Sequence, residues 1–222
     1  MMFLRSVLLW TGMAAFFLGV PPASLGAKLL LDAATDTTTE SFTEFNSLAG
    51  QLLVAAPKMG DPRFSKTVIV MVNHDHTGAV GLIINKPLGS STVADLLAGF
   101  GENGHGVVDT IAINYGGPVQ PFLGFSLHSS DFTNEHTTVV NDYLSMSPGV
   151  EVLKAIAAGT APRNALFMLG YAGWGPGQLE GELQRNDWVV APADEVLIFV
   201  QDSEQGSDKK WEKALNRMQI DL

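Results

Sequence analysis

The chain has 222 residues, a formal net charge of −10 and no cysteine. This length is enough for one domain with a sizeable core, and the lack of cysteine excludes disulfides, thiolate nucleophiles and cysteine-based zinc sites. An acidic chain repels phosphate backbones, and its positive residues are scattered, so we expect no nucleic-acid partner.

The first 26 residues have the three parts of a secretory signal peptide. Met1–Arg5 is short and basic, Ser6–Val20 is mostly apolar, and residues 21–26 break the apolar run. Ser24 and Gly26 are small residues at the positions that precede a cleavage site. The sequence therefore predicts export to the periplasm or the medium, without a stable membrane span once residues 1–26 are removed.

Two alternatives to a cleaved leader stay open. An uncleaved membrane anchor is one, because Leu29–Leu31 extends the apolar character beyond Lys28. Against it, the apolar run is shorter than the about 20 residues that a membrane-spanning helix needs. The other alternative is a chance apolar N-terminus or a misplaced start codon.

Residues 33–47 are polar and rich in threonine, and the segment 27–47 is predicted to be a flexible tether. The folded domain is predicted to span residues 48–222. Its first part contains short runs rich in valine and isoleucine, bounded by glycine, proline, asparagine or aspartate. These runs predict strands at 51–56, 67–72, 79–85 and 110–115.

Turn and cap signals separate the predicted elements. Asn73–Gly78 joins two strands at hairpin spacing, and Thr92–Asp95 has the form of a capping box that opens a helix through Phe100. Ser147–Pro148 predicts a helix start, with the helix ending before Gly159. A C-terminal helix is predicted from one apolar face formed by Trp211, Leu215, Met218 and Leu222.

The order of elements favours an α+β fold in a single domain. Strands come first and helices are interspersed later, without strict alternation. We expect a mixed, curved β-sheet or a partly closed barrel, flanked by helices. A doubly wound parallel fold is disfavoured because the glycine-rich block follows a late strand and lacks the G-x-G-x-x-G order.

That block, Gly170–Gln178, is the most distinctive segment of the chain. The apolar run 165–169 enters it, a helix-like segment follows, and Trp188 opens another apolar run, so the pattern predicts strand, wide turn, helix and strand. Amides gathered at the helix start could hold an anion. Alternatively, the glycines shape a tight crossover while Trp174 packs, and no Lys-Ser/Thr pair of a nucleotide loop follows.

Several polar residues are weak candidates for chemistry. His74 and His76 could bind a metal only with a third ligand, and we expect them to be solvated in a turn. His128 precedes Ser129–Asp131, but adjacency in sequence does not produce triad geometry and no G-x-S-x-G elbow exists. We expect His128 to end a strand.

Acidic residues give no catalytic pair either. Asp61–Arg63 is expected to form a structural turn around Pro62. Glu180 and Glu182 lie two apart on a predicted helix and therefore face different directions. The sequence predicts no catalytic residue, no metal site and no cofactor.

Several motifs follow one another in register along the predicted domain: Gln51–Pro57 with Gly60–Phe64, Gly78–Pro87, Tyr115–Val119 with Gly124–Ser129, the glycine-rich block, and Trp211–Leu215. Together they resemble the signatures of the YqgE/AlgH family, which has no established biochemical activity. The resemblance covers about residues 48–222.

Two features depart from the family pattern. Members often carry cysteine before the histidine of the hairpin, where this chain has Val72 and Asn73, so a thiol-based role is excluded. Most members look cytoplasmic, and the predicted leader argues against carrying a cytoplasmic role over to this chain.

These observations support three hypotheses. The first is a non-enzymatic binding or regulatory protein with an unknown protein or small-molecule partner. The second is an enzyme, or degenerate enzyme, that binds an anionic small molecule at Gly173–Gln178. The third is a transcriptional regulator, a label that comes with the family resemblance. The predicted binding residues are Gly116, Gly117, Gly173, Trp174, Gly175, Gly177 and Gln178.

Overall fold

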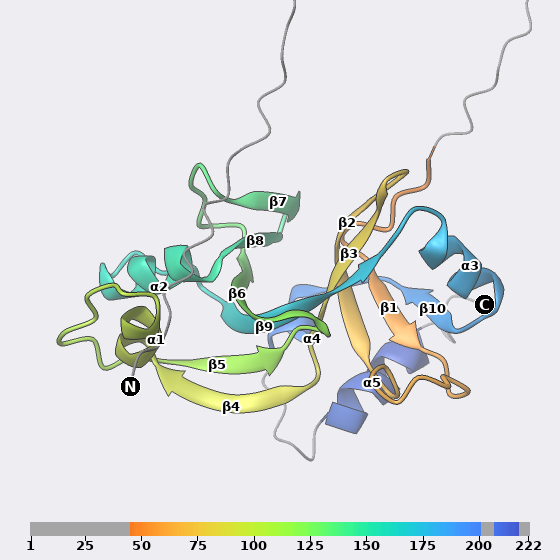
Figure 1. Cartoon of the computed structure of the whole chain (residues 1–222), viewed down its shortest axis with the longest axis horizontal. Helices are drawn as coiled ribbons and strands as arrows, with labels where there is room; N and C mark the ends of the chain where they lie inside the picture. The colour runs from red at the N-terminus through yellow and green to blue at the C-terminus, as the bar shows by residue number, and fades with distance from the viewer. Residues whose placement is uncertain (1–44, 201–206, 218–222) are drawn as a thin grey trace, which may run out of the picture. The chain divides into compact units, whose positions relative to one another are not determined.

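A mixed sheet of ten strands dominates the computed structural model, which describes residues 45–200 and 207–217 (Figure 1). All of them belong to the second of two units of the chain, Thr43–Leu222. The predicted leader, residues 1–26, lies outside the described residues. No helix within the described ranges is long and apolar enough to span a bilayer.

The strands and helices alternate irregularly along the chain. The strands are β1 (Leu52–Ala55), β2 (Val68–Asp75), β3 (Gly78–Ile83), β4 (Pro87–Thr92), β5 (Thr110–Tyr115), β6 (Val119–Ser129), β7 (Thr138–Asn141), β8 (Leu144–Pro148), β9 (Ala165–Trp174) and β10 (Trp188–Ala191). The helices are α1 (Val93–Gly99), α2 (Gly149–Ala157), α3 (Gln178–Gln184), α4 (Glu195–Phe199) and α5 (Ser207–Arg217).

The sheet is open and mixed, as the order of elements predicts. The strand order is β10-β1-β2-β3-β9-β6-β8-β7, and β4 and β5 branch from β9. Strand β5 runs parallel to β9, whereas the other pairings between described strands are antiparallel. The α+β class is therefore confirmed, with an open sheet in place of a barrel.

Strand β9 joins the two halves of the sheet. Its C-terminal residues, Ala172–Trp174, pair with β3, whereas residues 167–169 pair with β5 and also with β6 on the opposite edge. Figure 1 shows β9 crossing the centre of the view, between the side with β4, β5, α1 and α2 and the side with β1, β2 and β3. The glycine-rich block therefore lies where the two halves meet.

The central strands are buried on both faces. In β1, Leu52 and Val54 contribute to a core beneath α4 and α5, while Leu53 and Ala55 contribute to a second core beneath α3. Successive side chains of a strand point to opposite faces, so a strand covered on both sides reads as a continuous apolar run. A third core, around Phe167, packs against α1 and α2.

Two of the predicted helices differ in how they begin. Helix α1 starts after Thr92, whose side chain accepts a hydrogen bond from the Asp95 amide, as the capping box predicts. Helix α2 starts at Gly149, and its N-cap Pro148 makes no side-chain capping bond. The prediction of Ser147 as the cap is wrong because β8 continues through Pro148 and directs Ser147 toward other partners.

The glycine-rich block is mostly strand. Strand β9 continues through Gly170 and Gly173 to Trp174, and three residues then lead into α3. The predicted order of strand, helix and strand is confirmed, but the turn is shorter than predicted. In the C-terminal helix, Trp211 and Leu215 pack on the core beneath α5, and Met218 and Leu222 lie outside the described residues.

Candidate functional site

A cavity of about 470 Å³ opens where four segments meet. They are the loop after β1, the start of β6 with the residue before it, the turn from β9 into α3, and the segment from α3 into β10. Such a volume lies in the range of small-molecule sites. The cavity is lined by Met59, Gly60, Asp61, Arg63, Phe64, Pro118, Val119, Gly173, Trp174, Gln178, Glu182, Arg185, Asp187 and Trp188.

The carboxylate of Glu182 is the focus of this lining. Its Oε2 atom accepts hydrogen bonds from Nε1 of Trp174, at 2.8 Å, and from Nε1 of Trp188, at 2.7 Å. Its Oε1 atom accepts one from Nε2 of Gln178, at 3.0 Å. The two indole rings meet edge to face, with centroids 6.1 Å apart. These bonds fix both tryptophans and the carboxylate in one arrangement.

Two ion pairs line the same cavity. The guanidinium of Arg63 holds Asp61, with Nη2 2.6 Å from Oδ2, and this hydrogen bond lowers the pKa of the Asp61 carboxyl below its usual value. Arg185 Nε lies 3.0 Å from Asp187 Oδ2. The Arg63 amide also donates to Asp61 Oδ1, which confirms the predicted turn. Each arginine is therefore held by a carboxylate two residues away.

The structure brings some of the predicted binding residues to this cavity. Gly173, Trp174 and Gln178 line it, whereas Gly116, Gly117, Gly175 and Gly177 do not. Gly116 and Gly117 pack against the backbone of β9, where a Cβ on Gly117 would lie 2.2 Å from the carbonyl carbon of Tyr171. Their role is to admit this close contact, which places the following Pro118 and Val119 on the cavity wall.

The predicted anion loop has internal partners for its polar groups. The Gly175 amide donates to Oε1 of Gln178 at 3.1 Å, and Gly177 takes a positive φ of 71° as the N-cap of α3. Helix α3 has seven residues, with Glu180 in its first turn. Anion binding at this turn stays a prediction, and the observed contacts do not favour it.

The sequence predicts only three of the fourteen lining residues as binding residues, Gly173, Trp174 and Gln178. Phe64, Arg185, Asp187 and Trp188 come from segments in which it predicts only a turn, a helix or a strand start. The Phe64 and Trp188 rings meet edge to face, with centroids 5.5 Å apart. No local sequence pattern predicts this contact, because it depends on the pairing of β10 with β1.

His74 is buried, so the expectation of a solvated turn histidine is wrong for this residue. Its Nδ1 accepts the Leu48 amide at 3.1 Å, and its Nε2 lies 2.9 Å from Oε1 of Glu180. Nδ1 is an acceptor, so Nε2 carries the proton and donates to the carboxylate. The burial arises because β2 continues through His74 to Asp75.

The end of the predicted tether contacts the same histidine. Within residues 27–47, only residues 45–47 are described; the Phe45 ring lies edge-on to His74 at 4.8 Å, and the Ser47 hydroxyl donates to the His74 carbonyl. His76 is exposed. Across the described ranges, no three histidine, aspartate or glutamate side chains converge as a metal site requires.

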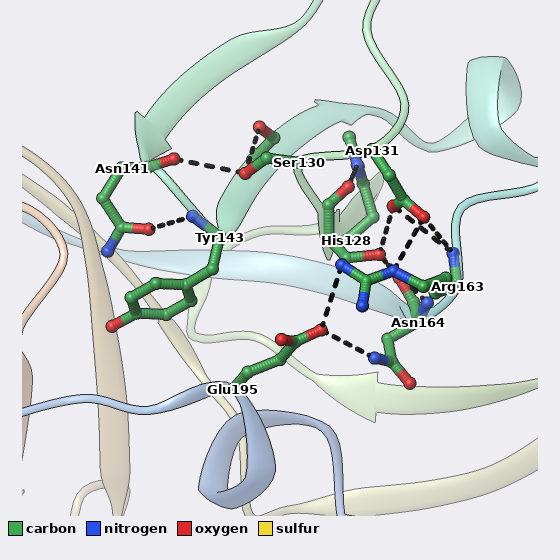
Figure 2. A network of polar contacts seen from close by, with 10 residues as sticks. His128, Ser130, Asp131, Asn141, Tyr143, Arg163, Asn164 and Glu195 are labelled. Carbon is green, nitrogen blue, oxygen red and sulfur yellow. Dashed lines mark hydrogen bonds and ion pairs between the residues drawn. The ribbon is translucent and has the colours of Figure 1, made fainter.

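Figure 2 shows the surroundings of His128, which ends β6 as predicted. The ring is fully buried, its Nδ1 lies 2.9 Å from the Ser129 carbonyl oxygen, and its Nε2 lies 2.9 Å from Oγ of Ser147. A carbonyl can only accept, so Nδ1 carries the proton and Nε2 accepts from the hydroxyl. Burial lowers the pKa of His128.

The hydrogen bonds of the Asp131 carboxylate go to groups other than the histidine nitrogens. Its carboxylate accepts the Ser129 hydroxyl at 2.6 Å and Nε of Arg163 at 3.0 Å. In Figure 2 the arginine lies between Asp131 and Glu195, which also accepts a hydrogen bond from Asn164. Serine, histidine and aspartate are therefore neighbours without triad geometry, and the network ties the loop before β9 to α4.

Comparison with known proteins agrees with the motifs. The family model described as AlgH-like (DUF179) matches residues 52–222. A UPF0301 protein of Rhodospirillum rubrum is 42% identical over 78% of this chain and 88% of its own length. One of Methylococcus capsulatus is 44% identical over 78% and 93%, respectively.

Two solved structures are similar. The AlgH protein of Pseudomonas aeruginosa shares 36% identity with a TM-score of 0.64, over 85% of this chain and 93% of that one. Protein DIP2367 of Corynebacterium diphtheriae, at 21% identity and a TM-score of 0.58 over 76% of this chain and 85% of that one, shares the fold. The resemblance drawn from the sequence motifs is confirmed, and this chain belongs to the AlgH-like family.

Proposed function

We propose that this protein is a non-enzymatic binding protein whose binding site is the cavity around Glu182. The observation that carries the proposal is the fixed arrangement of Trp174, Trp188 and Gln178 on one carboxylate. Ligand sites are typically lined by aromatic side chains with a few precisely placed polar groups. Because these side chains are already fixed, little side-chain entropy is lost on binding.

The chemistry of the lining favours binding over catalysis. The ionisable groups on the cavity are the pairs Asp61–Arg63 and Asp187–Arg185, together with Glu182. A hydroxyl, thiol or amine nucleophile needs a base beside it, and the serine, threonine, histidine and lysine side chains of the described residues lie outside this lining. Carboxylates can also act as nucleophiles, but Asp61 and Asp187 are paired with arginines and Glu182 is hydrogen-bonded to both indole groups. The proposal therefore ranks binding above the enzyme hypothesis. Regulation of transcription rests on the family label alone.

Two glycine variants can test the cavity as the site. Gly60 lines the cavity, has no positive φ, and a Cβ added to it would have no neighbouring atom within 4 Å, so Gly60→Phe should fill the space with little strain. Gly99 lies outside the cavity lining, has no positive φ, and has no atom within 4 Å of an added Cβ. Gly99→Phe is therefore the matched control.

The measurement is a thermal-shift screen of the full chain against organic cations, organic anions, neutral metabolites and divalent metals. A ligand at 100 times its Kd adds about 2.7 kcal/mol of stability. We expect compounds that stabilise wild type to stabilise Gly99→Phe equally and to lose at least tenfold in affinity for Gly60→Phe. If compounds that stabilise wild type also stabilise Gly60→Phe and Gly99→Phe equally, the binding site does not lie in this cavity.

We also propose that the chain is exported. The support is the sequence pattern of residues 1–26, a basic segment, an apolar run and small residues before the cleavage position. Mass spectrometry of the protein from its native host should find an N-terminus at Ala27. An intact Met1 in the soluble cytoplasmic fraction would refute export.

A further inference from the structure

We infer that the cavity around Glu182 takes an organic cation, an ammonium or guanidinium group, which binds to the Glu182 carboxylate beside Trp174 and Trp188. The inference rests on the proposed function and names its ligand class. It follows from the charge balance of the cavity, the hydrogen bonds of Glu182 and the aromatic rings around it.

Charge balance singles out one carboxylate. Three carboxylates and two guanidinium groups line the cavity, so its net charge is negative. Asp61 is paired with Arg63 and Asp187 with Arg185. Among the described residues, Glu182 has no ion-pair partner, and its three hydrogen-bond donors are neutral N–H groups. A positive ligand would therefore compensate a charge that the protein leaves uncompensated.

The hydrogen bonds of Glu182 leave room for such a ligand. An ionised carboxylate offers about four acceptor sites on its two oxygens. Two indole N–H groups occupy Oε2, and the Gln178 amide occupies one site on Oε1. One site on Oε1 remains. An ammonium or guanidinium N–H would fill it with a charge-assisted bond, which is about twice as strong as a neutral one.

Aromatic rings suit a cation at the same place. Trp174, Trp188 and Phe64 line the cavity, and neighbouring rings meet nearly at right angles, at 79° and 73°. The negative face of an aromatic ring attracts a cation within about 6 Å of its centroid. The protein already uses this contact at the rim, where the Arg63 guanidinium carbon lies 5.7 Å from the Phe64 ring centroid.

An anion fits less well. Both arginines on the cavity are held by carboxylates, so an anionic ligand would have to displace Asp61 or Asp187. It would also approach Glu182 in a chain whose formal net charge is −10. The field of an acidic protein raises the local concentration of cations and lowers that of anions.

The decisive probes are two compounds that differ in charge but have nearly the same shape. Nα-acetyl-arginine amide carries a guanidinium, and Nα-acetyl-citrulline amide carries a neutral urea in its place. Binding to the full chain is measured by NMR on ¹⁵N-labelled indole groups, since the Nε1–H groups of Trp174 and Trp188 report directly on the Glu182 contact. We expect saturable shifts of these two resonances with the arginine compound and at least tenfold weaker binding of the citrulline compound.

The Glu182→Gln variant removes the charge and keeps the shape, so it should lower the affinity for the arginine compound at least tenfold. Glu135→Gln, a carboxylate that is exposed and outside the cavity lining, makes the same change in net charge and should bind as wild type does. Equal binding of both compounds to wild type would overturn the inference, and this comparison stands even where Glu182→Gln does not fold. An unchanged affinity of a folded Glu182→Gln variant for the arginine compound would also overturn the inference.

A further arm separates the two sources of such a cation. Acetyl-Gly-Arg-Gly-amide binding more tightly than the single amino-acid compound would assign the site to an arginine side chain of a partner protein. Equal or weaker binding of the peptide would assign the site to a free small cation. The affinities of lysine amide and tetramethylammonium, compared with that of the arginine compound, then show whether the site prefers an ammonium or a guanidinium group. If anionic or neutral compounds from the screen bind and Gly60→Phe blocks them, the cavity remains the binding site and the cation assignment is wrong.

Discussion

Lys210 is a buried lysine, 3% exposed, that holds α5 to the rest of the domain. Its ammonium donates to the carbonyl oxygens of Ile84, Ile198 and Val200, at 3.2, 3.3 and 2.8 Å. Ile84 directly follows β3, Ile198 lies in α4, and Val200 directly follows α4. A lysine is almost never fully buried without such partners, so the contact fixes the position of three elements at once.

We expect Lys210→Met to lower the free energy of unfolding by about 3 kcal/mol, because methionine fills the space but leaves buried carbonyls without their donor. Urea denaturation of the full chain measures the change. Lys209→Met is the matched control, since Lys209 precedes it on α5 and is exposed; its effect should stay within about 0.5 kcal/mol. Similar losses in both variants would contradict the role given to Lys210.

At the scale of residues, the sequence predicts contacts whose partners are close in the chain. The Thr92 cap and the Asp61 turn join residues two or three positions apart, and both predictions are confirmed. His74 and Lys210 could not be predicted, because Glu180 lies 106 residues from His74 and Ile84 lies 126 residues from Lys210. Glu182 acquires its indole donors only when β9 and β10 are in place.

At the scale of elements, β9 depends on close backbone contact with the segment after β5. Gly117 has a φ of 153°, and its α-carbon lies so close to β9 that an added Cβ would meet the Tyr171 carbonyl at 2.3 Å. In return, a Cβ on Gly170 would meet the Gly117 carbonyl oxygen at 2.4 Å. The atoms that each added Cβ would meet belong to the backbone, so they cannot rotate away as a side chain could.

Gly117→Ala should therefore destabilise the protein by about 3 kcal/mol or more, at the upper end of what overpacking costs, and disturb the cavity wall at Pro118 and Val119. Gly99→Ala is the control, because Gly99 lies in α1 and its added Cβ meets nothing within 4 Å. Alanine favours a helix over glycine by up to about 1 kcal/mol, so this variant should be neutral or stabilised. Thermal denaturation of both variants checks the contrast.

Elements with apolar periodicity were predictable, and those without it were missed. Strands β1, β2, β3 and β5 are found close to their predicted ranges. Strand β4 has the polar sequence PLGSST and none of its residues is buried, so its composition is typical of a loop. It is a strand because it pairs with β5. In β6, four exposed residues precede the buried ones, and the register shifts against β9 between Val119 and Gly124.

At the scale of the whole molecule, the sequence predicts the class of fold but not the strand order. Strands β1, β2 and β3 are neighbours in both sequence and space. Strand β10 pairs with β1 from the far end of the chain, and β9 inserts between β3 and β6. Such pairings depend on which apolar faces find each other in three dimensions, and the segments that line the cavity are brought together by them.

The free energy of unfolding should depend on pH through His128. Burial lowers the pKa of this histidine below its ordinary value of 6.5, so below that pH the unfolded chain binds a proton that the folded protein excludes. Stability increases with pH wherever the unfolded state binds more protons. The contribution of His128 is therefore fully present above pH 6.5 and is lost as the pH falls from 6.5 toward the lower pKa of the folded state.

Urea denaturation of the full chain between pH 7.5 and 5 tests this dependence. One proton accounts for at most about 1.4 kcal/mol per pH unit, and His128→Asn should remove that part of the slope while its amide can still donate to the Ser129 carbonyl. His136→Gln, at an exposed histidine, should keep the wild-type slope. Asp61, Asp75, Asp131 and Glu180 also have lowered pKa values, but these carboxyls contribute near and below their ordinary values of 3.8 for aspartate and 4.5 for glutamate, below this window. An identical slope in wild type and His128→Asn would show that the buried histidine is not the group that titrates.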